Sequence, residues 1–320
     1  MTTTTTLTPV TPTDSPQSTR TPADRLQAET TAVRLRIRWP GTRKTLSRHH
    51  RQRAADTFAA QGDSVSVSKK LIDTGHPTFR ATTAIRTQVV EYWKRTTLPY
   101  VEPGTRLLRR RDLADFDTRM STYRDGLAAA VGDLNRHYSD LIEGARQMLG
   151  DLFDRSDYVD DLRESFAIDW EYPSTAAPDY LLQISPGLYQ AECDRIKDRF
   201  DEAVRLTEQA FAEELGQLVG HLAERLSGQS DGSPKVFRDS AVTNLREFFD
   251  RFERLNIRSD DQLDRLVEDA RRVLSGVGPQ ELRDQAGLRQ SLSRELTRVE
   301  ASLDGYLTDR PRRRILRPGR

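Results

Sequence analysis

The strongest constraint on the fold is a heptad repeat of apolar and small residues between about residues 111 and 153. One row of the repeat is Leu113, Met120, Leu127, Leu134, Leu141 and Met148, and the other is Phe116, Tyr123, Ala130, His137 and Gly144. Two such rows form the a/d seam of a helix about 60 Å long. The repeat therefore predicts a helix that packs lengthwise against another long helix.

A second long helix is predicted after Pro186. Its stripe advances in steps of three and four along Cys193, Ile196, Phe200, Val204, Thr207, Phe211, Leu215, Leu218, Leu222 and Leu226. This is a hendecad repeat, which favours a nearly straight stripe. The segment between the helices contains prolines and is long enough to reverse the chain. We therefore predict a mostly α fold with a long antiparallel, coiled-coil-like helical hairpin, and pairing of the two helices between chains stays open.

The sequence divides into five regions around this hairpin. They are a disordered Thr/Pro-rich tail at 1–22, a basic region of one strand and helices at 23–104, the hairpin with a small β insert at 105–228, a C-terminal helical bundle at 235–308 and a basic tail at 309–320. Period-two alternation predicts the strand at 33–39, and helices are expected at 47–60, 79–97, 157–166, 235–255, 259–275 and 279–307. Two β-like runs, 167–172 and 180–184, are expected to form a hairpin beside that strand.

The composition favours an elongated protein without a membrane span. Apolar residues make up 36 % and charged residues 31 % of the chain, a balance typical of long helices that expose most of their faces. No stretch approaches the roughly 18 apolar residues that a membrane span needs. The Thr-rich start lacks the pattern of a signal peptide, so we expect a cytoplasmic location.

The residues of known catalytic and ligand-binding motifs are absent or wrongly spaced. Lys44-Thr45 follows a strand as in a phosphate-binding loop, but both glycines of that loop are missing. His49 and His50 lie among arginines, which oppose a metal ion. The aspartates at 151–161 are spaced as on a helix, unlike a calcium loop. We therefore predict that the protein is not an enzyme, with no catalytic, cofactor-binding or metal-binding residues.

Basic residues gather in the N-terminal region and at the C-terminus, where we place a candidate surface for an anionic partner. These residues are Arg34, Arg36, Arg38, Arg43, Lys44, Arg48, Arg51, Arg53, Arg312, Arg313 and Arg314. Counterion release would drive phosphate binding by such a cluster. The plainer interpretation, which we prefer, is a solvated arginine-rich face or pairing with acidic helices of another subunit.

Several short motifs follow one another in a recognisable order. They are Trp39-x-Gly41-x-Arg43-Lys44 after the strand, Ser68-Lys69-Lys70-Leu71, Phe79 opening an arginine-bearing helix, and a Pro-Gly break before a long helix. Over about residues 30–230, this order resembles an uncharacterised family of bacterial and phage proteins, catalogued as a domain of unknown function. Such proteins tend to be encoded near MoxR-like AAA+ ATPases and von Willebrand A-domain proteins. The resemblance thus implies a partner of one of these classes and supplies no catalytic residues.

Two long patterned helices without a converging set of catalytic residues favour a non-enzymatic scaffold or adaptor, of phage or mobile-element origin, that acts through protein–protein interaction. The alternative is a nucleic-acid-binding protein that uses the basic N-terminal region and the C-terminal tail. Homo-oligomerisation stays open, and no membrane contact is expected.

Overall fold

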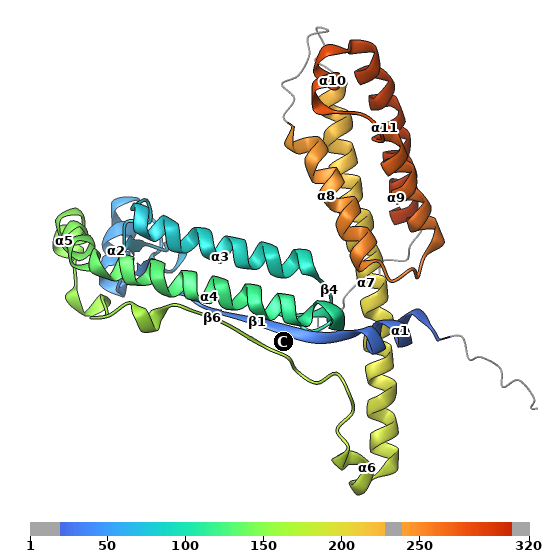
Figure 1. Cartoon of the computed structure of the whole chain (residues 1–320). Coiled ribbons are helices and arrows are strands. Elements are labelled where there is room, and N and C mark those ends of the chain that lie inside the picture. The colour runs from blue at the N-terminus through green and yellow to red at the C-terminus, as the bar shows by residue number, and fades with distance from the viewer. Residues whose placement is uncertain (1–19, 228–238, 309–320) are drawn as a thin grey trace, which may run out of the picture.

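The computed structural model describes residues 20–227 and 239–308 (Figure 1). Its α-helices are α1 (Pro22–Glu29), α2 (Arg48–Thr57), α3 (Pro77–Thr96), α4 (Leu113–Arg136), α5 (Tyr138–Leu149), α6 (Tyr180–Ile184), α7 (Pro186–Leu226), α8 (Ser240–Leu255), α9 (Asp261–Val273), α10 (Pro279–Asp284) and α11 (Ala286–Thr308). Its strands are β1 (Thr30–Arg38), β2 (Arg43–Thr45), β3 (Ser68–Lys70), β4 (Thr97–Pro99), β5 (Thr105–Arg109) and β6 (Ala167–Glu171). The predicted mostly α class is confirmed. The basic tail at 309–320 lies outside the described residues, as do residues 1–19 of the predicted N-terminal tail.

Four antiparallel strands form a sheet in the order β4-β5-β1-β6. Successive side chains of a strand point to opposite faces, and the two faces of this sheet meet different hydrophobic cores. Ala32 and its cross-strand partner Leu107 belong to the core around α7. Their neighbours Val33 and Leu108 belong to the core of α3, α4 and α5. The sheet thus joins two separately packed bodies. We call the body built on α3, α4 and α5 the arm, and the body built on α7, α8, α9 and α11 the bundle (Figure 1).

In the arm, α4 lies along α3. The apolar face predicted for this helix is buried at Phe116, Met120, Leu127 and Leu134. The helix does not continue to residue 153, because α4 ends at Arg136 and α5 begins at Tyr138, with His137 between them at φ −98° and ψ 4°. Met148, near the end of the repeat, is 69 % exposed. The repeat therefore located the buried face and overestimated the length of the helix.

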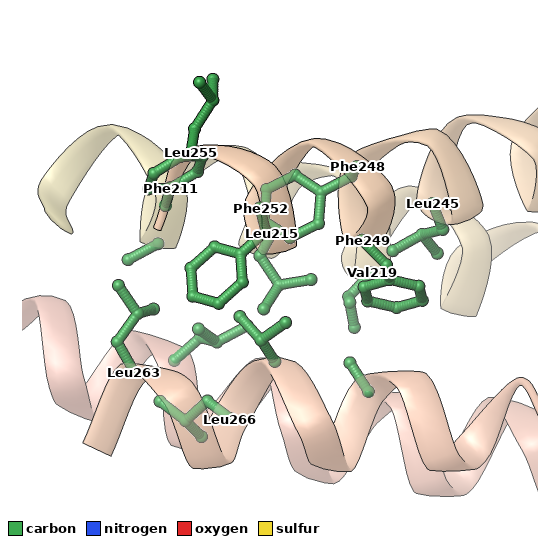
Figure 2. Packing of buried hydrophobic residues seen from close by; sticks show 14 of the residues in the cluster. Phe211, Leu215, Val219, Leu245, Phe248, Phe249, Phe252, Leu255, Leu263 and Leu266 are labelled. Carbon is green, nitrogen blue, oxygen red and sulfur yellow. The ribbon is translucent and has the colours of Figure 1, made fainter. Parts of the chain in front are cut away.

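The bundle forms around the 41-residue helix α7. Ser185 caps its start by accepting a hydrogen bond from the Leu188 amide at 3.4 Å, and Pro186 follows in the first turn. Helices α8, α9 and α11 pack on the C-terminal part of α7, while α1 crosses it nearer its middle. Figure 2 shows the side chains that fill the space between the helices, where Phe211 and Phe252 meet at 5.0 Å between ring centroids.

The predicted hairpin of the two long helices is wrong. Helix α4 packs on α3 and on the sheet, whereas α7 packs on α1, α8 and α11. An apolar stripe fixes which face of a helix is buried and leaves open which element covers it. Helix α3 and the C-terminal helices each have an apolar face of their own, and these faces cover the two stripes separately.

The β insert was predicted in part. The run at 167–172 forms β6, which pairs with β1 as expected, with Arg34 opposite Glu171. The run at 180–184 is helical and forms α6, so the expected hairpin of the two runs is wrong. Short apolar runs do not distinguish strand from helix by periodicity. In place of the expected helix at 157–166, the chain makes two 3-10 turns, at Arg155–Asp157 and Arg163–Ser165.

Among the helices at 20–227 and 239–308, none combines the length and the apolar character that a membrane span requires.

Candidate functional site

The structure divides the predicted basic surface into two groups, and the first is occupied by carboxylates. Arg34 donates from Nη1 to Glu171 and from Nη2 to Glu102, each at 3.1 Å, and from Nε to Thr105 Oγ1 at 3.0 Å. Arg36 donates to the same Glu171 at 2.8 Å. These two arginines on β1 therefore link β6, the β4–β5 turn and β5, and their charges are largely neutralised.

The second group forms a basic head at the far end of the arm, built from β2, β3 and α2 (Figure 1). Lys44 and Lys69 are cross-strand partners in the β2–β3 hairpin, and both pair with the Asp157 carboxylate. That carboxylate side chain is 1 % exposed. Lys69 also donates to the Leu152 carbonyl at 2.6 Å. The two lysines thus anchor the hairpin to the turns that follow α5.

The anchor at Asp157 should make the basic head sensitive to acid. Burial alone would raise the pKa of Asp157, but hydrogen bonds and charges from Lys44 and Lys69 outweigh it and hold the pKa below its ordinary value. A carboxyl whose pKa is lowered by folding stabilises the protein above its unfolded-state pKa, and this contribution is lost as the pH falls through the folded-state pKa.

We therefore expect Asp157→Asn to destabilise the protein at neutral pH and to have a smaller effect at an acidic pH below the ordinary pKa of aspartate. Urea unfolding of both proteins at both pH values measures the difference, and Asp160→Asn, at an exposed carboxylate nearby, is the control. An equal loss of stability at the two pH values would contradict the role assigned to the Asp157 charge.

The other basic residues predicted in the arm have no carboxylate partner among the described residues. Within the described part of the chain, Arg38, Arg43, Arg48, Arg51 and Arg53 form no ion pair. Three of them lie on α2, whose start is capped by Ser47. Arg312, Arg313 and Arg314 lie outside the described residues.

A shallow cavity of about 710 Å³ lies beside the head, between the end of β1 and α3. Its lining contains Arg80 and Arg86 and no carboxylate, and the Arg86 guanidinium lies 5.4 Å from the centre of the Trp39 ring. The basic head with this cavity is the part of the predicted surface that is left free for an anionic partner.

A second surface was missed in the sequence. Four apolar side chains at the junction of α6 and α7 are exposed, and we call them the apolar tip. They are Tyr180 (59 % exposed), Leu182 (51 %), Ile184 (70 %) and Leu188 (56 %). The tip lies at the free end of α7, away from the arm and the bundle (Figure 1). The signal in the sequence is an apolar run between Pro178 and Pro186, which the pattern alone predicts as a strand.

In residues 20–227 and 239–308, no three His, Cys, Asp or Glu side chains gather in an arrangement that would hold a metal ion. No family model, curated protein or solved structure matches the chain.

Proposed function

We propose that this protein is a non-enzymatic helical scaffold or adaptor that acts through protein–protein contacts. The observation that supports it best is the apolar tip. Exposed apolar side chains are common singly, whereas four on adjacent turns are typical of an interaction site. Their place at the free end of a 41-residue helix puts this surface within reach of a partner.

The charges around the tip indicate the chemistry of the partner. Arg195 pairs with Glu192, Arg199 pairs with Glu102 and Glu192, and the exposed Lys197 forms no ion pair among the described residues. The exposed carboxylates of Asp179, Asp194 and Asp198 form no ion pair in the described residues. Charges of both signs around an apolar centre favour a protein partner with an apolar groove and a polar rim.

Replacing Leu182 and Ile184 by serine should abolish partner binding and leave the fold intact, because both side chains are more than half exposed. The matched control is Phe58→Ser with Met148→Ser, at apolar residues 79 % and 69 % exposed on the arm. The resemblance provides defined probes, namely a purified MoxR-like AAA+ ATPase and a von Willebrand A-domain protein from the same host. Binding is measured by surface plasmon resonance, and self-association by sedimentation velocity.

Loss of binding in the tip variant alone supports the proposal. Self-association that the tip variant loses would identify a second copy of the chain as the occupant. Equal partner binding and equal self-association of the wild type, the tip variant and the control contradict the proposal.

The alternative, nucleic-acid binding through the basic head, draws support from the cavity beside Trp39 and from five arginines that form no ion pair with the residues at 20–227 and 239–308. It is weaker than the sequence suggested, because Arg34, Arg36 and Lys44 already have carboxylate partners. DNA or RNA binding that weakens steeply with salt, and that the tip variant retains, would favour it.

A further inference from the structure

A cavity of about 910 Å³ lies where the arm meets the bundle. Its walls come from α3, β4, β5 and α4 on one side and from α7 and α8 on the other. Its volume is within the range of small-molecule sites. Five cationic side chains line it, against the two carboxylates of Glu91 and Glu214. The cations are Lys94, Arg95, Arg106, Arg119 and Arg251.

Arg106 is held rigidly on the arm side of the cavity. Its Nε donates to Thr97 Oγ1 at 2.7 Å, and its Nη2 donates to the Thr97 carbonyl at 2.9 Å. Its guanidinium lies 5.6 Å from the centre of the Trp93 ring. Among the described residues, no carboxylate pairs with it. Burial, and next the charge of Arg251, lower the pKa of Arg106 to about 10, so the guanidinium is still charged at neutral pH.

Arg251 is the corresponding cation on the bundle side. Its side chain is 17 % exposed, lies against Phe248 and pairs with Glu214. Its Nη2 is closed to solvent and makes no aligned hydrogen bond with the described residues, although it faces the Glu214 carboxylate. Two guanidiniums of like charge therefore line the same cavity. The Glu214 carboxylate pairs with Arg251 and leaves the charge of Arg106 uncompensated by the described residues.

We propose that this junction cavity binds a small organic or inorganic polyanion, whose oxyanion groups interact with Arg106 and Arg251 together. Charge-assisted hydrogen bonds from guanidinium groups are the strong contacts for phosphate and carboxylate groups. Tyr92, Leu98 and Phe211 supply an apolar wall for the rest of the ligand. Because the cations belong to different bodies, the ligand fixes the arm against the bundle. The proposal does not depend on the scaffold function.

The Glu214 carboxylate competes with the ligand for Arg251. Substitutions of these two residues should therefore change the affinity for the ligand in opposite directions. Arg251→Gln should weaken binding by about tenfold or more, because one charge-assisted contact is lost. Glu214→Gln should strengthen it severalfold, because the competing charge is removed while Arg251 stays. A purely structural role of the ion pair would instead make both variants less stable without opposite effects on binding.

Isothermal titration calorimetry of the full chain measures binding of inorganic pyrophosphate and of citrate at matched ionic strength, which separates phosphate from carboxylate ligands. Arg272→Gln, at a surface Arg–Asp pair elsewhere on the bundle, is the control and should change nothing. If Arg251→Gln does not fold, Lys94→Gln, at an exposed side chain, takes its place with a smaller loss of affinity. Binding of either anion with the opposite shifts supports the site. Absence of binding by both anions, or affinities unchanged in all variants, overturns it.

Discussion

Replacing Phe248 by alanine is expected to lower the free energy of unfolding of the bundle by about 3–5 kcal/mol. The side chain is 1 % exposed, meets Phe211 edge to face at 6.1 Å and stacks on Phe252 at the same distance. Truncation removes a large apolar group and leaves a cavity that rigid helix–helix packing fills only in part. The effect should remain local, because Phe248 belongs to the bundle core alone.

The tryptophans of the chain can show whether the loss of stability is confined to the bundle. All three tryptophans, Trp39, Trp93 and Trp170, pack against the arm core. Tryptophan fluorescence therefore follows unfolding of the arm, whereas far-ultraviolet circular dichroism follows the helices of both bodies. Phe248→Ala should move the circular dichroism transition to lower denaturant concentration and move the fluorescence transition less.

The matched control is Phe116→Ala in the arm, since Phe116 is also 1 % exposed. It should move the fluorescence transition by a comparable free energy. Contacts in separate cores share no neighbours, so the two losses should add in the double variant. If both substitutions shift the fluorescence and circular dichroism transitions equally, the two cores unfold as one unit. The arm and the bundle would then not be separate units of stability.

The same division explains which parts of the fold the sequence revealed. Periodic apolar stripes located the buried faces of α4 and α7 because helical geometry places such residues on one side. The stripes did not reveal that α3 covers one and α11 the other, since pairing depends on the shapes and positions of distant elements. Residue 137, a member of the repeat, lies where α4 gives way to α5, and heptad spacing contains no sign of that break.

The candidate sites were predictable to different degrees. Clustered basic residues predicted the basic surface, but the Glu171 and Asp157 carboxylates that pair with Arg36 and Lys44 are more than 100 positions away from them in sequence. The junction cavity combines Arg106 and Arg251, which belong to no motif and come together only because α8 packs at the end of α3. The apolar tip was visible as a run of apolar residues whose exposure depends on the absence of a covering element among the described residues.

Arg109→Met is expected to cost about 2–5 kcal/mol, because it leaves two carbonyls inside the protein without their charged donor. The Arg109 residue is 6 % exposed at the end of β5. Its Nη2 donates to the Leu255 carbonyl at 3.1 Å and to the Asn256 carbonyl at 2.9 Å, and its Nη1 pairs with Glu29. Helix α8 ends at Leu255, so the guanidinium lies at the negative end of the helix dipole.

Methionine fills a similar volume and donates no hydrogen bond, so the two carbonyls at the end of α8 would lose their donor inside the protein. Arg111→Met is the matched control. Arg111 also donates to the end of α8, at 2.8 Å to the Arg254 carbonyl, but its side chain is 65 % exposed. Exposed charges contribute little, so this variant should lose less than about 1 kcal/mol. Arg109→Lys keeps the charge without the forked donor geometry and should fall between the two.

Because Arg109 connects the arm to the bundle, its loss should also weaken the coupling between them. In Arg109→Met, the fluorescence and circular dichroism transitions should separate further than in the wild type, and small-angle scattering at native conditions should show a broader distribution of distances. Arg111→Met should leave both observables unchanged. If Arg109→Met and Arg111→Met unfold at the same urea concentration, the carbonyls of Leu255 and Asn256 are satisfied by water in solution. The contact between β5 and α8 would then be too open to hold the two bodies together.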